Sequence, residues 1–331
     1  MKIGSIEVKP ATAARHAIDL IELADGLRVS LPVLLINGAR PGPRLYLGAG
    51  IHGDEVGGVA ILARVVRDLR PAELSGSLVC VMVQNPLAFH ADHRIPIGHY
   101  LKSPLDQAPI DAWTCFPGHA DGPFAEVLAA KLFDLIRACE YAIDLHTPTR
   151  GGRYVPITIL PPARLGAAAA KAEELGEAFG SGYVIKTDKG MYVRDGILNV
   201  EATKAGVPTF TFEIGEGGRV EPDLVAFGAG CVLNVLRHLG MLTGSPVRPA
   251  QVVRLREFLG LRSTRGGMLY NDVELGASLK KGDTVARIVN IYGDEVERIT
   301  SPSDGINVRI TTLSTVAAGE RVATIGLLAN A

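Results

Sequence analysis

The most informative stretch of this chain reads Leu45-Tyr46-Leu47-Gly48-Ala49-Gly50-Ile51-His52-Gly53-Asp54-Glu55. Its apolar run predicts a buried strand that ends at His52, turns at Gly53 and enters a helix whose first turn carries Glu55. A His and a Glu on the two sides of such a turn can converge on one divalent cation. By itself, however, an H-x-x-E pair more often belongs to a surface or to a helix cap.

A second strand-like run, Tyr141-Ala142-Ile143-Asp144-Leu145, also ends in a His, His146. Two His and one Glu leave one tetrahedral position of zinc open, which is the ligand count of a hydrolytic rather than a structural site. His52, Glu55 and His146 are therefore candidate ligands of one zinc ion. Asp144 lies two residues before His146 on the same face of the strand, and we hypothesise that it orients a metal-bound imidazole.

The composition narrows the classes of partner. Lys and Arg total 34 against 35 Asp and Glu, the formal charge is −1, and aromatic residues make up 5%. No charge block or stacking surface indicates nucleic-acid binding, and no apolar segment is long enough to span a membrane. We expect a small-molecule substrate and leave homo-oligomerisation open. The amino terminus has no apolar signal core, and the four cysteines have no C-x-x-C spacing, so we expect a cytoplasmic protein with reduced thiols.

The order of patterns along the chain predicts an α/β fold. Between residues 31 and 244, apolar strand-like runs alternate with amphipathic segments, which is typical of a mixed sheet with helices on both faces. In such sheets, ligands bind at the carboxyl ends of the strands, where both His residues fall. A Pro-, His- and Gly-rich loop at 90–122 is long enough to be functional. The helices are expected at 56–69, 124–139, 167–179 and 224–239.

The sequence pattern changes after residue 249, where short β runs are separated by Gly and Asp turns and no helical pattern occurs. We therefore expect two domains, 1–249 and 250–331, with a strand-rich extension over about residues 1–30.

Five short motifs follow one another along the chain: Gly48–Gly58, Asn85–Phe89 with Arg94, Phe116–Gly118, Asp144–His146 and Phe212–Gly218. Taken in this order, they resemble the succinylglutamate desuccinylase/aspartoacylase family of zinc deacylases. The resemblance implies a three-layer fold like that of zinc carboxypeptidases, and it looks closest to bacterial members that deacylate small N-acyl amino acids or diamino acids.

The resemblance also implies roles for individual residues. Zinc would be held by His52, Glu55 and His146. Glu213 would be the general base that deprotonates the attacking water and then protonates the leaving amine, and Arg94 would polarise the scissile carbonyl. Two alternatives remain open from the residues alone. Glu213 could instead be a carboxylate at a strand end that pairs with a surface base. Arg94 could instead form an ion pair with Asp92 or Asp111.

One motif departs from the family pattern Asp-Leu-Asn-Arg-x-Phe-Pro-Gly, in which the Asn-Arg pair clamps a substrate carboxylate. Trp113 and Thr114 stand at these two positions here, and neither can form a bidentate pair with a carboxylate. Substrates with a second carboxylate, such as N-acetylaspartate and N-succinylglutamate, should therefore be poor. Lys102, Arg150 and Arg153 are the candidate substitutes for the clamp, and the spacing selects none of them. The candidate substrate-binding residues are Asn85, Trp113, Thr114, Arg150 and Arg153.

The C-terminal module resembles biotinyl/lipoyl-like domains through Leu275–Asp283, Ser301–Gly305 and Val316–Glu320. Carrier domains of this type bear a modified Lys in a hairpin, but residues 288–299 contain no Lys. We expect a module that is not a carrier and that narrows the mouth of the active site.

The sequence thus predicts a zinc-dependent amidohydrolase that cleaves the acyl–amine bond of a small N-acyl amino acid or related amine. Two alternatives are a zinc carboxypeptidase that acts on peptides and a catalytically inactive member that binds a metabolite. The missing Asn-Arg pair disfavours the first, and retention of the implied ligands and base disfavours the second.

Overall fold

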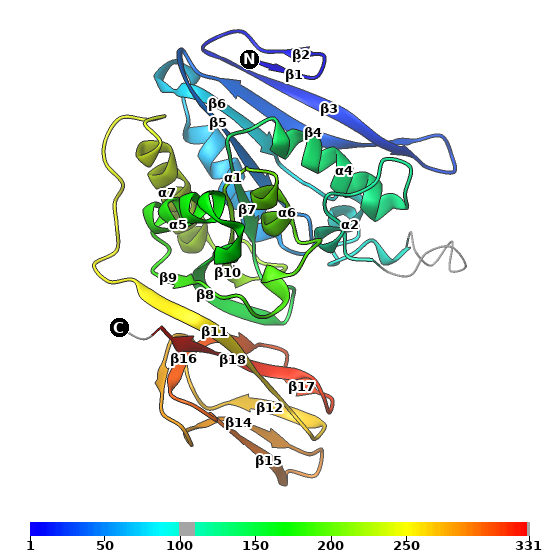
Figure 1. The fold of residues 1–331 in the computed structure, drawn as a ribbon. Helices are drawn as coiled ribbons and strands as arrows, with labels where there is room; N and C mark the ends of the chain where they lie inside the picture. The colour runs from blue at the N-terminus through cyan, green and yellow to red at the C-terminus, as the bar shows by residue number, and fades with distance from the viewer. Residues whose placement is uncertain (99–109, 330–331) are drawn as a thin grey trace.

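The structure, a computed structural model, describes residues 1–98 and 110–329. Figure 1 shows an α/β body that carries the amino terminus and, below it, a part built of strands that carries the carboxyl terminus. Among the described residues, no helix is both long and apolar enough to span a membrane.

A mixed β-sheet forms the centre of the α/β body. β6, β5, β7 and β10 lie side by side and parallel, and β4 and β8 flank this group in the antiparallel direction. The expected mixed α/β fold is therefore confirmed. The strands of this body are β1 (Lys2–Ile3), β2 (Ile6–Glu7), β3 (Thr12–Glu22), β4 (Arg28–Asn37), β5 (Arg40–Ala49), β6 (Ser75–Val81), β7 (Tyr141–His146), β8 (Gly152–Ile159), β9 (Tyr183–Ile185) and β10 (Thr209–Glu216).

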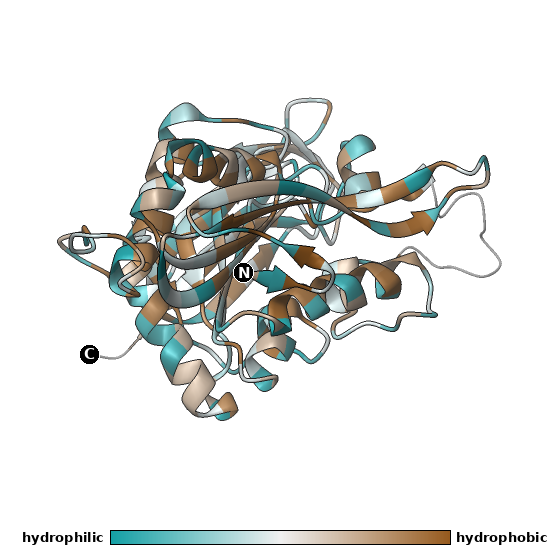
Figure 2. Cartoon of the chain, turned by 90° about the horizontal axis from the view of Figure 1, so that it is seen from above, coloured by the Kyte–Doolittle hydropathy of each residue, from teal (hydrophilic) through white to brown (hydrophobic). Residues whose placement is uncertain are grey.

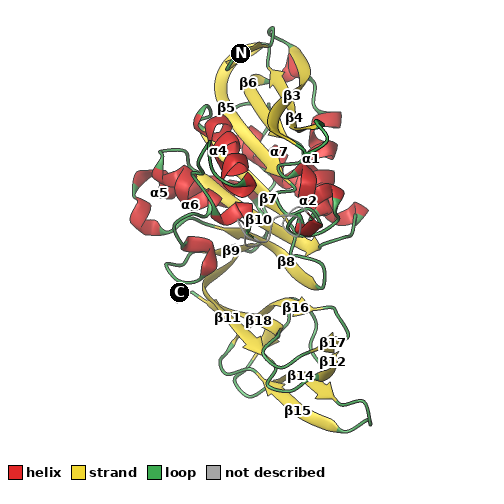
Figure 3. Cartoon of the chain, turned by 90° about the vertical axis from the view of Figure 1, so that its right-hand side faces the viewer, coloured by secondary structure: helices red, strands yellow, loops and turns green. Residues whose placement is uncertain are grey.

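Helices pack on both faces of this sheet (Figures 1 and 3). One apolar cluster joins α1, α5 and α7 to the sheet, and a second joins α4 and α6 to its other face. Leu45 and Leu47 belong to the first cluster and Tyr46 to the second, because successive side chains of a strand point to opposite faces. The helices are α1 (Val56–Asp68), α2 (Pro86–His90), α4 (Phe124–Arg137), α5 (Ala167–Phe179), α6 (Leu198–Lys204) and α7 (Pro222–His238).

The central strands are continuous apolar runs because helices cover both faces of the sheet, and Figure 2 shows the resulting distribution of hydropathy. The central strands are mostly hydrophobic, whereas the helices around them carry hydrophilic and hydrophobic residues side by side. The four helices expected from periodicity are found within two residues of the predicted bounds, at α1, α4, α5 and α7. Outside residues 99–109, the body also contains four short 3₁₀ turns: η1 (Pro71–Glu73), η2 (Ala112–Thr114), η3 (Ala163–Leu165) and η4 (Met191–Val193).

The C-terminal part contains strands and no helix among its described residues, 250–329. β12, β14, β15 and β17 form a four-stranded sheet, and the other strands continue the large sheet of the α/β body. The strands are β11 (Val253–Arg262), β12 (Gly267–Asn271), β13 (Ser278–Leu279), β14 (Thr284–Val289), β15 (Glu295–Thr300), β16 (Gly305–Thr311), β17 (Thr315–Val316) and β18 (Arg321–Leu328).

Two pairings join this part to the α/β body. β11 pairs parallel with β9, and β16 pairs antiparallel with the beginning of β8. Because β8 also pairs with β9, and β18 pairs with both β11 and β16, the strands β8, β9, β11, β18 and β16 form a closed ring. Its interior is an apolar cluster that includes Ile157, Leu255 and Val308. The two sides of the expected boundary at residue 250 therefore share a sheet.

Candidate metal and active site

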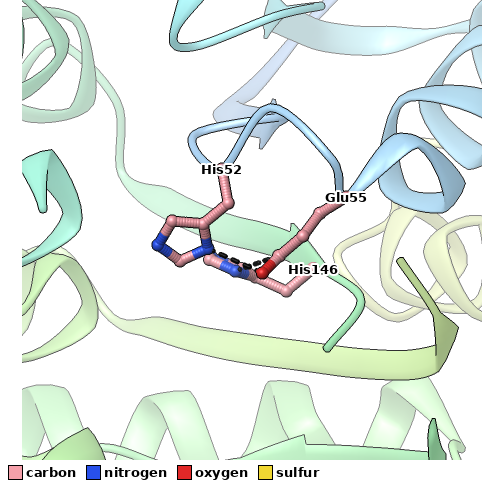
Figure 4. A group of neighbouring side chains, drawn as sticks. All are labelled: His52, Glu55 and His146. Carbon is pink, nitrogen blue, oxygen red and sulfur yellow. Dashed lines mark hydrogen bonds and ion pairs between the residues drawn. The ribbon is translucent and has the colours of Figure 1, made fainter. Parts of the chain in front are cut away.

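Three side chains from the carboxyl edge of the sheet point toward one another (Figure 4). His52 follows β5, Glu55 directly precedes α1, and His146 is the last residue of β7. Each is 2% exposed, and the ligand atoms of the three residues all lie within 4.8 Å of one another. β5 and β7 are adjacent and parallel, so their ends meet at one edge, as the sequence predicts.

The turn between His52 and Glu55 is held by close backbone packing. A Cβ atom at Gly53 would lie 1.9 Å from the carbonyl oxygen of Ala88, so a side chain cannot be placed there without moving backbone. The Gly53 N–H also donates to the carbonyl of His93. This packing fixes the direction in which the residues on either side project.

The corresponding nitrogen atoms of the two imidazoles face the same kinds of partner. Nδ1 of each faces a Glu55 carboxylate oxygen at 2.8 Å, whereas Nε2 of His52 faces Asp111 at 3.1 Å and Nε2 of His146 faces Asp144 at 2.7 Å. An Nε2–H that donates to a carboxylate leaves the lone pair of Nδ1 directed at Glu55. Three lone-pair donors directed at one point suit a divalent cation, so the residues present fit a zinc ion.

The pKa shifts of these buried groups also favour a cation at the centre of the cluster. Burial opposes charge on His146, yet Asp144 and Glu55 raise its pKa well above the ordinary value. Burial likewise opposes charge on Glu55, but the two imidazoles hold the pKa of its carboxyl well below the ordinary range. The cluster therefore stabilises positive charge at its centre, which protons or a metal ion can supply.

Arg94 lies beside this cluster. Its Nε and Nη2 donate to Asp111 Oδ2 at 3.1 and 2.8 Å, and its Nη1 donates to the Thr149 hydroxyl at 2.8 Å and approaches Glu55 at 3.4 Å. The ion pair with Asp111, which the sequence left open as an alternative, is thus present. The guanidinium nevertheless lines the same cavity as the candidate ligands, so the pair holds it in place.

The two positions that depart from the family pattern behave differently. Trp113 is 1% exposed, and its indole N–H donates to Asp144 Oδ2 at 3.1 Å. Its ring also meets both candidate histidine ligands edge-on, with centroids 6.0 Å from His52 and 5.6 Å from His146. Thr114 is exposed, and its hydroxyl donates to the Asp111 carbonyl. Trp113 therefore supports the ligands, and Thr114 lies outside the cavity lining.

Glu213 lies on β10 directly opposite His146 in the parallel pairing. The Tyr192 hydroxyl donates to its Oε1 at 2.9 Å, and its buried Oε2 has no hydrogen-bond partner among the described residues. Burial, with a further contribution from the negative charge of Glu55, raises the pKa of Glu213 to about 7. A buried carboxylate with one free oxygen and such a pKa is suited to exchange a proton.

These groups line a cavity of about 360 Å³. Two of the lining residues come from the C-terminal part, Arg309 on β16 and Arg321 on β18. The other lining residues are His52, Glu55, Arg94, Asp111, Trp113, His146, Pro148, Thr149, Tyr154, Met191, Tyr192 and Glu213.

Other expected substrate-binding residues do not line this cavity. Asn85 caps α2, with its side-chain oxygen accepting from Ala88 N–H. Arg150 pairs with Asp92, and Arg153 pairs with Glu221. Their role in substrate binding stays a prediction, and Lys102 lies outside the described residues.

Sequence reasoning missed several cavity residues. Asp111 was identified only as a partner for Arg94, although it also orients His52. Tyr192, Arg309 and Arg321 were not identified, because they belong to no local motif. Strand pairing between distant parts of the chain brings the two arginines to the site.

Comparisons with known proteins agree with this arrangement. A family model described as the succinylglutamate desuccinylase/aspartoacylase catalytic domain matches residues 41–239. The N-alpha-acetyl-L-2,4-diaminobutyric acid deacetylase of Halomonas elongata is 25% identical over 306 residues, which cover 90% of this chain and 85% of that protein. The succinylglutamate desuccinylase of Burkholderia cenocepacia is 28% identical over 202 residues, covering 59% and 54% of the two chains.

Solved structures resemble the chain over nearly its full length. The product-bound ectoine utilization protein EutE (DoeB) from Ruegeria pomeroyi has a TM-score of 0.85 at 22% identity and covers 98% of both chains. A succinylglutamate desuccinylase/aspartoacylase structure from Rhodobacter sphaeroides has a TM-score of 0.82 at 23% identity and covers 98% of this chain and 99% of that one. Since the family model spans more than half of the sequence and the fold agrees throughout, the chain belongs to the succinylglutamate desuccinylase/aspartoacylase family.

Proposed function

We propose that this protein is a zinc-dependent hydrolase that cleaves the acyl–amide bond of a small N-acyl amino acid or related N-acyl amine. The observation that carries the proposal is the buried cluster of His52, Glu55 and His146. Glu213 lies beside this cluster, and its Oε2 has no hydrogen-bond partner among the described residues. The matched relatives are a deacetylase of an acetylated diamino acid and desuccinylases, which supports a deacylase reaction on a small molecule.

His52, Glu55 and His146 would hold the metal through Nδ1, a carboxylate oxygen and Nδ1. Zinc bound there would supply Lewis acidity, which polarises a carbonyl and lowers the pKa of water. Asp111 and Asp144 fix the two imidazoles through their Nε2 atoms. These contacts keep the ligands oriented before a substrate arrives.

Glu213 is the proposed general base. Its free Oε2 takes a proton from the attacking water and later delivers it to the nitrogen of the leaving amine. The Tyr192 hydroxyl holds the other oxygen, so the carboxylate keeps one orientation through both steps. Arg94, held by Asp111, would stabilise negative charge that develops on the carbonyl oxygen.

We also propose that the helix–sheet–helix body is of the three-layer zinc-carboxypeptidase type and that the C-terminal part is a biotinyl/lipoyl-like module without carrier function. The absence of Lys from residues 288–299 supports the second point. Thr312 on this part donates to Glu216 at 2.7 Å, on the strand that carries Glu213, which supports a role in shaping the site.

Zinc stoichiometry together with turnover tests the proposal. The metal-loaded protein should contain about one zinc per chain and release free amine from members of a panel of N-acetyl and N-succinyl amino acids. Hydrolysis of dipeptides but not of these amides would identify a carboxypeptidase. Tight binding of the amides without release of amine would identify an inactive binding protein.

A further inference from the structure

Two arginines in the cavity wall lack acidic partners among the described residues. The Arg309 guanidinium donates to the Thr311 hydroxyl at 3.1 Å, and no ion pair involves Arg309 or Arg321 within residues 1–98 and 110–329. The other cation of the cavity, Arg94, is paired with Asp111. Guanidinium groups in a partly buried wall are costly to leave unpaired, so this pair indicates a site for an anionic group.

The fold places both guanidinium groups at the cavity. In the β16–β8 pairing, Arg309 lies opposite Tyr154, a lining residue, and its guanidinium lies over Gly152. A Cβ at Gly152 would stand 2.5 Å from Arg309 Nη2, so glycine leaves the room that this side chain occupies. Arg321 begins β18, the strand hydrogen-bonded to β16, and reaches the same cavity.

The electrostatics of the pair also favour an anion. Burial lowers the pKa of the Arg309 guanidinium, and the positive charge of Arg321 lowers it further, whereas Tyr154, Tyr192 and Glu213 act in the opposite direction. A carboxylate between them would relieve this repulsion and accept hydrogen bonds from both guanidinium groups.

We infer that Arg309 and Arg321 form the receptor for one carboxylate of the substrate and thereby replace the clamp whose positions Trp113 and Thr114 occupy. This inference rests on the proposed function. The favoured substrates are N-acyl amines that carry one carboxylate. A second carboxylate would face Glu55, Glu213 and Asp111 without a free cation, which agrees with the poor turnover expected for dicarboxylic substrates.

The test measures binding rather than turnover. Zinc-loaded Glu213→Gln protein is titrated by calorimetry with three probes: N-acetyl-L-alanine, with a carboxylate on the amine side, N-ethylsuccinamic acid, with one on the acyl side, and N-acetyl-L-alaninamide, with none. One of the two acids should bind at least about tenfold more tightly than the neutral amide. The acid that binds more tightly identifies the end of the substrate that the arginines bind.

The same titrations are repeated after Arg309→Gln and Arg321→Gln, each added to the Glu213→Gln protein. Each should weaken binding of the preferred acid by about 10- to 100-fold and leave the neutral amide within about threefold. Arg298→Gln is the matched control, because Arg298 pairs with Glu295 on the surface of the same part of the chain. Arg309→Lys keeps the charge and should restore part of the affinity if the glutamine variant folds poorly.

Two outcomes overturn the inference: neither acid binds more tightly than the amide, or the preferred acid keeps its affinity in both glutamine variants because it binds the metal instead. Failure of the proposed function appears separately, as wild-type protein that binds zinc and the probes but releases no amine.

Discussion

His146 shows how much one residue determines in this site. Its Nδ1 faces Glu55 and its Nε2 faces Asp144, both from a fully buried position. Replacing His146 with Ala removes one of the three proposed ligands, and two ligands do not hold zinc tightly at this kind of site. Metal analysis of purified His146→Ala protein should find well under half of the wild-type zinc. Wild-type occupancy would place the metal elsewhere.

Glu213→Gln separates chemistry from metal binding. The amide keeps the shape of the side chain but cannot accept a proton, so amine release should fall at least about 100-fold, the usual scale of a general base. Zinc content should not change, because Glu213 is not one of the three clustered ligands. Steady-state kinetics measure the loss. Activity within tenfold of wild type would assign the base to another group, and Glu216, which Thr312 contacts, is the next candidate.

Trp113 gives a subtler prediction. Trp113→Phe preserves an aromatic ring against both histidines but removes the N–H that Asp144 accepts. Loss of such an outer contact typically weakens metal binding by about tenfold or more. Competition with a chelator should therefore show weaker zinc binding in Trp113→Phe and a larger loss in Asp144→Asn, which changes the direct partner of His146. Unchanged zinc affinity in both variants would mean that neither contact orients the ligand.

The sequence predicts residues of this site only where a local pattern carries them. His52 and His146 end apolar strands, and the parallel pairing that such runs favour makes their ends meet. Tyr192 has no such pattern, since it lies in a short 3₁₀ turn and not at the end of an apolar strand. The orientation of Trp113 could not be read either, because whether its indole faces a substrate or an aspartate depends on packing between distant segments.

At the scale of elements, Gly58 determines how closely α1 approaches β7. A Cβ there would lie 2.6 Å from the backbone oxygen of Leu145, the residue before His146. Gly58→Ala should therefore push apart the two elements that carry Glu55 and His146. We expect a loss of about 1–3 kcal/mol of stability, typical of overpacking, together with weaker zinc binding.

Gly230→Ala in α7 is the matched control for this change. No atom lies within 4 Å of the position of the added Cβ, so the substitution should leave zinc binding unchanged and favour the helix slightly. Urea unfolding of the metal-free variants and zinc titration measure the two effects. Equal behaviour of the two alanine variants would show that contact between α1 and β7 does not position the ligands.

Elements were predictable where their period is long and unbroken. The four principal helices have several turns of apolar spacing, and their bounds follow from it. β8 was missed because Pro156 interrupts its apolar run, and β9 and α6 are only three and seven residues long. The pairing of β16 with β8 could not be predicted, because nothing local to either strand specifies a partner so distant in the sequence.

For the whole molecule, the closed ring predicts cooperative unfolding. The α/β body and the C-terminal part share β-ladders at two places, so calorimetry should show one transition. Ile288→Ala tests this coupling, since Ile288 is fully buried in the apolar cluster of the C-terminal part. It should cost about 2–5 kcal/mol and shift the entire transition to lower temperature. A shift confined to one of two separate transitions would show independent units.

The ring also has a consequence for the growing chain on the ribosome. The three clustered ligands are complete by His146 and Glu213 follows, but β16, which supplies Arg309, is synthesised near the end. Domains generally begin to fold from the amino terminus during synthesis. A nascent chain can thus bring the proposed metal ligands and Glu213 together before Arg309 and Arg321 exist. If the proposed roles hold, a message truncated after α7 would encode a centre without its carboxylate receptor and with exposed strand edges.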